Sequence, residues 1–140
     1  MTTYLNFHTG ALFLTALVVG GMVFFSFVAA PTAFRALGSE HGGRYIRAVF
    51  PLYYRTMLAC SLGAAILVYY RIDGWLLALV AGLFLFADVV LRPAINRYRD
   101  AHLAGDARAR TPFRWLHGLS MLVNLVQLGI AGFVLLRLAA

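Results

Sequence analysis

One carboxylate in this chain lies where its surroundings should be hydrocarbon. Asp88 interrupts the apolar stretch 84–92, FLFADVVLR, and Arg92 follows four residues later on the same face of a helix. A charge left alone in a membrane costs several kcal/mol, so such charges pair or line a polar cavity. The residues therefore predict either an ion pair that stabilises helix packing or a site for a solute, an ion or a proton.

Arg55 lies at a matching depth on the preceding apolar segment. The short turn RIDG joins the two segments, and a helix rises 1.5 Å per residue. This places Arg55 about 26 Å, Asp88 about 23 Å and Arg92 about 29 Å from the turn. We therefore expect an Arg55–Asp88–Arg92 cluster, with Tyr54 facing the same interior or, alternatively, belonging to an interfacial belt of aromatic rings.

A polar stripe recurs on the last apolar segment at spacings of three and four residues. Its members are His117, Ser120, Asn124 and Gln127. Polar side chains in a membrane helix face the bundle interior. The stripe predicts either a cavity open to one leaflet or a set of hydrogen bonds between helices.

His8 and His117 are the candidate ligands for a metal or a haem. They lie at different depths, so one subunit cannot use both on one ion, although each could bind at its own side. The sequence has no HExxH, CxxC, Gly-rich phosphate loop or nucleophile elbow. We therefore expect no cofactor and no enzymatic activity, and a metal or haem at these histidines is the alternative.

The composition indicates which elements carry these residues. Of 140 residues, 62% are hydrophobic and 12% are charged, against about a quarter charged in soluble domains. Four segments, at about 5–34, 48–70, 75–91 and 113–136, each approach or exceed the roughly 20 apolar residues that a spanning helix needs. The predicted fold is an all-α integral membrane protein, a four-transmembrane-helix bundle forming one domain over residues 1–140.

Arginine positions predict the orientation of this bundle. Most of the arginines lie in the loops after the first and third segments, and short cytoplasmic loops are rich in basic residues. Both termini are then outside, in a multi-pass protein of the cell inner membrane. The net charge of +7 suits anionic lipid headgroups at the cytoplasmic face better than nucleic acid, because the charges cluster between apolar runs.

Prolines and glycines mark the expected helix boundaries. Pro51 is expected to begin the membrane part of the second helix, and Gly20-Gly21 is an expected kink point in the first. Thr111 is expected to cap the last helix with Pro112 at its first position, and the preceding helix should break near Gly105.

The four prolines also form two pairs with a similar spacing. Pro31 and Pro93 are each followed by a second proline about 20 residues later. This spacing suggests a parallel repeat of two helical hairpins, or a coincidence.

Four stretches together resemble a known family. They are GGMVFFSFVAAPTAF, VFPLYYR, RPAINRYRD and FRWLHGLSMLVNLVQL, and the last contains the pattern F-x-x-x-H-x-x-S-x-x-x-N. The chain resembles the small four-helix membrane proteins of unknown function related to transmembrane protein 205. It is remotely similar to the copper-resistance D membrane proteins and to the four-helix protoporphyrinogen oxidase that binds haem. The resemblance implies a fold more than a chemistry, because their ligands do not map cleanly onto His8 or His117.

Three functions are compatible with these observations. The leading hypothesis is a non-enzymatic membrane protein that binds or passes a small solute or ion at a polar site near the cytoplasmic leaflet. The second is a haem- or metal-linked redox protein using His8, His117 or both. The third is a structural subunit of a membrane complex. Four helices enclose little space, so a transport path would favour a homo-oligomer.

Overall fold

A computed structural model describes the backbone of residues 2–140 and the side chains of residues 6–140. The fold is all helical. The elements in order are α1 (Thr2–Phe24), the π-helix η1 (Phe25–Ala29), α2 (Ala30–Leu67), α3 (Ile72–Phe86), the π-helix η2 (Ala87–Leu91), α4 (Arg92–Leu103), the 3₁₀-helix η3 (Ala107–Ala109) and α5 (Arg110–Ala139).

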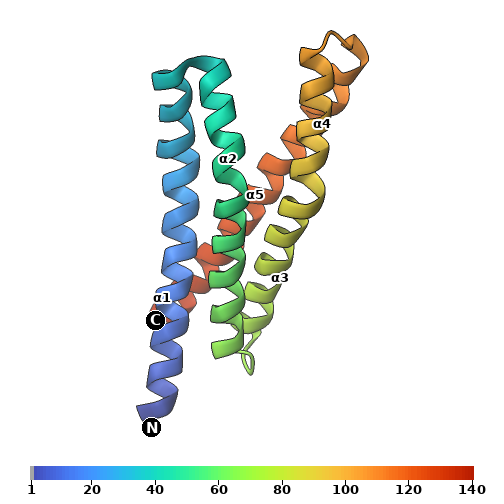
Figure 1. Cartoon of the computed structure of the whole chain (residues 1–140). Helices are drawn as coiled ribbons and strands as arrows, with labels where there is room; N and C mark the ends of the chain where they lie inside the picture. The colour runs from blue at the N-terminus through green and yellow to red at the C-terminus, as the bar shows by residue number, and fades with distance from the viewer. Residues whose placement is uncertain (1) are drawn as a thin grey trace.

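Three helical runs are long and apolar enough to cross a membrane: Asn6–Leu67, Ile72–Leu103 and Ala107–Ala139. The first run, of 62 residues, is not straight. Gly38 has φ 72° and ψ 175°, a conformation that only glycine adopts readily, and the chain reverses direction near it (Figure 1). The count of four separate spans predicted from the sequence is therefore not supported as it stands, because the first two predicted spans are arms of one helical run.

The apolar surface of these runs is too large for the protein to cover. Only 22%, 44% and 17% of the most apolar windows of the three runs is buried inside the chain. Since water does not favour so much exposed hydrocarbon, lipid must cover the rest, and the protein is embedded in a membrane. Large apolar side chains that point outward include Phe13, Phe27, Leu52, Ile66, Trp75 and Leu136.

The helices pack as a ring. α1 packs against α2 and α5, and α3 also packs against α2 and α5. Among the described residues, α1 does not contact α3, and α2 does not contact α5. One buried cluster, near the α2–α3 turn, contains Ala64, Val68, Leu77 and Val134, and a second, in the middle of the bundle, contains Met22, Met57, Phe84 and Ala131.

Both π-helices occur just before a proline. Each ends two residues before one, Pro31 after η1 and Pro93 after η2. A proline ring inside a helix clashes with the carbonyl four residues earlier, and a widened turn relieves that clash. The matching placement favours the predicted two-hairpin repeat. α1 stays helical through Gly20-Gly21, and the kink expected there stays a prediction. A Cβ on Gly21 would lie 2.8 Å from Met57 Cε, so this glycine allows close packing of α1 on α2.

Two of the predicted helix starts differ from the structure. Thr111 does not cap the last helix: the turn of η3 begins earlier, where the Asp106 side chain accepts a backbone N–H at 2.9 Å. Thr111 and Pro112 thus lie inside the first turn of α5, where a missing N–H costs nothing. Pro51 lies within α2 rather than at its start. The predicted break near Gly105 is confirmed, with α4 ending at Leu103 and Gly105 at φ 99°.

Candidate functional site

Asp88 pairs with both arginines that the sequence placed beside it. Arg92 Nε donates to Asp88 Oδ1 at 2.8 Å, and Arg55 Nε lies 3.4 Å from Asp88 Oδ2. The carboxylate is 8% exposed, the Arg92 side chain 25% and the Arg55 side chain 70%. Asp88 therefore holds Arg92 tightly and Arg55 loosely, and the predicted contacts within this cluster are confirmed.

The hydrogen bonds to Asp88 use only one of the five N–H donors of each guanidinium group. Arg55 and Arg92 each donate to Asp88 through Nε, and no other described residue accepts a hydrogen bond from either guanidinium group. Two guanidinium charges also face one carboxylate. The arrangement leaves a positive excess and several N–H donors, a combination that suits a second anion.

The local backbone explains why Asp88 can reach both partners. Asp88 is part of η2, and the wider turn of a π-helix shifts the residues that follow it around the helix axis. Single-turn π-helices occur frequently at functional sites. Arg92 begins α4 directly after this turn, so η2 sets the position of both side chains.

Aromatic rings form the wall beside this cluster. Tyr54 precedes Arg55 in α2 and stacks on Phe50 with ring centroids 5.2 Å apart. Tyr53 stacks on Phe25 at 4.4 Å and packs edge-on against Phe84 at 6.2 Å. The predicted inward position of Tyr54 fits this geometry, and the rings lower the dielectric around the charges.

Among residues 6–140, two buried hydroxyl groups lack a protein partner. They are Tyr53 Oη and Ser61 Oγ, which lie two helical turns apart on the same face of α2. An unpaired buried hydroxyl costs about 1–3 kcal/mol, so a water or another polar molecule is the expected partner. Tyr53 is adjacent to Tyr54, which places one of these hydroxyls on the helix turn that carries Arg55.

The polar stripe of α5 serves mainly contacts between helices. Gln127 is buried and donates to the Val80 carbonyl of α3 at 3.3 Å, while Asn124 donates to Ser26 of η1 at 3.3 Å. Ser120 donates to the carbonyl of its own helix at His117, at 2.8 Å. The geometry favours the interhelical alternative for these residues, and a binding role for them stays a prediction.

Sequence reasoning missed a second buried carboxylate. Asp73 is fully buried at the start of α3, where its oxygens accept from Arg71 Nε at 2.9 Å and Arg137 Nε at 2.6 Å. The signal was present in the sequence, since Arg71 and Asp73 lie two residues apart in the short turn RIDG. Asp73 joins the α2–α3 turn to the end of α5.

A third polar contact joins α2 to α4 at the opposite end. Arg47 donates to Asp100 at 2.7 Å and to the side chain of Asn96 at 3.2 Å. The Arg99 guanidinium packs over Gly43, where a Cβ would lie 2.1 Å from Nη2. These contacts lie at the end where the sequence predicts the cytoplasm.

The histidines do not assemble a metal centre with other residues. The described chain contains no group of three or more His, Cys, Asp or Glu side chains that could hold a metal ion. His8 lies near the start of α1 and His117 near the start of α5, which are at opposite ends of the molecule (Figure 1). His117 is exposed and stacks on Phe113 with centroids 6.0 Å apart. A metal or haem role for either stays a prediction.

Comparisons with known proteins identify a family without a known activity. No curated protein and no solved structure is significantly similar to this chain. The comparisons do not show a relationship to transmembrane protein 205 or to the copper-resistance D proteins. One family model matches residues 13–104, a segment that contains Arg55, Asp88 and Arg92 and ends before α5. Because the match covers more than half of the chain, this membrane protein belongs to the family described as Domain of unknown function (DUF4149).

Proposed function

We propose that this protein binds or passes a small anionic solute at the Arg55–Asp88–Arg92 cluster and does not catalyse a reaction. One observation supports the proposal most directly. A buried carboxylate receives two guanidinium groups through Nε, and no other described residue accepts a hydrogen bond from either arginine.

Each residue of the site has a role in this proposal. Asp88 positions the guanidinium groups and offsets one of their two positive charges. Arg55 and Arg92 bind the anion, since a guanidinium presents paired donors to a carboxylate or phosphate. The hydroxyl of Tyr54 adds a donor at the aromatic wall. Arg55 is the entry residue, because its side chain is the most exposed of the three charged groups.

The same proposal includes a placement in the membrane. The chain crosses the inner membrane four times with both termini outside, and the cluster lies near the cytoplasmic leaflet. The reversal near Gly38 supports two crossings for the first helical run. Arginines cluster in the segments around Gly38 and Gly105, which supports a cytoplasmic position for both segments.

Anion binding can be tested through the stability of the purified protein. Sodium phosphate or sodium succinate is added in detergent at constant ionic strength, and the free energy of unfolding is measured. A ligand at 100 times its Kd stabilises the folded state by about 2.7 kcal/mol. We expect at least one of the two anions to stabilise the wild-type protein, and Arg55→Gln to weaken its binding at least tenfold.

Arg35→Gln is the matched control, because Arg35 makes no ion pair or hydrogen bond with the described residues. It should leave the stabilisation unchanged. The site would be refuted if Arg55→Gln and Arg35→Gln lost the anion-induced stabilisation equally, or if neither anion stabilised the wild-type protein. A Soret band in the absorption spectrum of the same sample would instead favour the haem-linked alternative.

The crossings can be tested separately with single cysteines in a Cys60→Ser background. Cysteines replace the exposed residues Asn6, Tyr70 and Ala104, and an impermeant thiol reagent is applied to intact cells. Four crossings predict labelling at positions 6 and 70 and none at 104. Labelling on opposite sides for positions 6 and 70 would leave the first helical run with a single crossing.

A further inference from the structure

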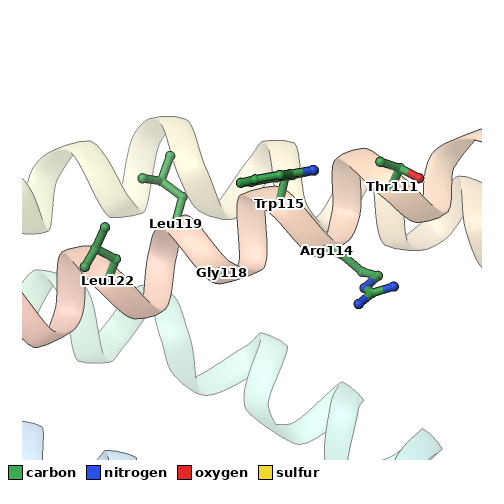
Figure 2. A pocket seen from close by; sticks show the side chains of 6 residues that line it. All are labelled: Thr111, Arg114, Trp115, Gly118, Leu119 and Leu122. Atoms are coloured by element: carbon green, nitrogen blue, oxygen red, sulfur yellow. The ribbon is translucent and has the colours of Figure 1, made fainter.

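The lipid-facing side of α5 carries a groove outside the site described above. It has a volume of about 600 Å³ and is lined by Thr111, Arg114, Trp115, Gly118, Leu119 and Leu122. Figure 2 shows Thr111, Trp115 and Leu119 on one side of the helix and Arg114 on the other, with Gly118 on the helix between them. The groove therefore runs along the helix, with a glycine as its floor.

Packing within the described chain does not require a glycine at position 118. A Cβ added there would meet no atom within 4 Å, and the residue has ordinary helical geometry. Glycine inside a helix is about 1 kcal/mol less favourable than alanine. The missing side chain creates no helix contact in the described protein; it only opens the floor of the groove.

The groove is polar at one end and apolar at the other. The Thr111 hydroxyl and the Arg114 guanidinium lie at the start of α5, and neither makes a hydrogen bond or ion pair with the described residues. Trp115 follows, and Leu119 and Leu122 complete the other end. Thr111 to Leu122 spans about 16 Å at 1.5 Å per residue. This length matches one leaflet of a hydrocarbon core about 30 Å thick.

We propose that this groove binds one anionic phospholipid of the leaflet at the α4–α5 end. The phosphate contacts Arg114 and Thr111, and an acyl chain lies over Gly118 beside Leu119 and Leu122. Along the groove, the cation, the interfacial tryptophan and the apolar floor follow in the same order as the phosphate, the interfacial region and the acyl chain of such a lipid. Charge complementarity favours a lipid over a second copy of the chain, because two copies meeting here would bring two unpaired Arg114 side chains together.

The two tryptophans of the chain allow a direct test. Trp75→Phe leaves Trp115, within the groove, as the only tryptophan, which is excited at a wavelength that tyrosine does not absorb. The protein is reconstituted into vesicles of fixed phosphatidylglycerol and phosphatidylcholine content, with brominated acyl chains on one lipid or the other. Bromine quenches tryptophan only at close range. We expect at least twofold stronger quenching when the same mole fraction of bromine is on phosphatidylglycerol.

Three variants complete the design. Arg114→Gln should abolish the preference by removing the cation, and Gly118→Leu should abolish it by filling the open floor, where a Cβ meets no atom within 4 Å. Trp115→Phe, which retains Trp75 at the other end of the bundle, should show no preference. Equal quenching of Trp115 by both lipids overturns the proposal, as does a preference that survives both Arg114→Gln and Gly118→Leu. Weak quenching by both lipids, together with disulfide cross-linking between two copies of a Gly118→Cys variant, would overturn the proposal and assign the groove to a second copy.

Discussion

The Asp88 cluster predicts two unequal couplings that a double-mutant cycle can measure. The Asp88–Arg92 contact is 2.8 Å long between side chains 8% and 25% exposed, whereas the Asp88–Arg55 contact is 3.4 Å long and Arg55 is 70% exposed. Breaking a buried pair leaves an uncompensated charge and costs about 3–5 kcal/mol. Exposed pairs contribute about 0.2–1 kcal/mol.

These magnitudes rank the variants. Asp88→Leu and Arg92→Leu should each destabilise the protein by about 3–5 kcal/mol. The double variant should recover much of that loss, because no unpaired charge remains, giving a coupling of about 2–3 kcal/mol. Arg55→Leu should cost about 1 kcal/mol or less and couple weakly to Asp88.

The assay is reversible unfolding in mixed micelles, with the free energy of unfolding measured for each single and double variant. Reversibility is checked by refolding the wild-type protein. Strictly additive losses for Asp88 and Arg92 would refute the reasoning, since residues in one ion pair must couple. An Asp88–Arg55 coupling larger than the Asp88–Arg92 coupling would refute the ranking by distance and burial.

Two further predictions concern the α2–α3 turn. Asp73→Asn should destabilise the protein by about 3–5 kcal/mol in the same unfolding assay, because it removes the buried partner of Arg71 and Arg137; an effect below about 1 kcal/mol would mean that these pairs contribute little. Gly74→Ala should also lower stability, since its Cβ would lie 2.5 Å from the Val68 carbonyl oxygen. The control Gly82→Ala places a Cβ that meets no atom within 4 Å, and it should be neutral or stabilising by up to about 1 kcal/mol. Equal effects of the two substitutions on the free energy of unfolding would contradict the close approach at Gly74.

The sequence by itself determined the features that depend on local geometry and composition. Apolar length fixed the helical membrane segments, because a bilayer sets the number of residues that a span needs. The spacing of Asp88 and Arg92 placed them on one helix face. The depth of Arg55 followed from a constant rise per residue along two helices joined by a short turn.

The tertiary structure alone decided how each helix is rotated and what it meets. Asp73 and Arg137 are 64 residues apart, and no local spacing predicts their 2.6 Å contact. Gln127 is buried and His117 is exposed, although both belong to one polar stripe, because α5 packs against different neighbours along its length. The reversal near Gly38 likewise joins two predicted spans into one run. Periodicity gives the direction of a side chain relative to its own helix, and only packing decides which surface that direction faces.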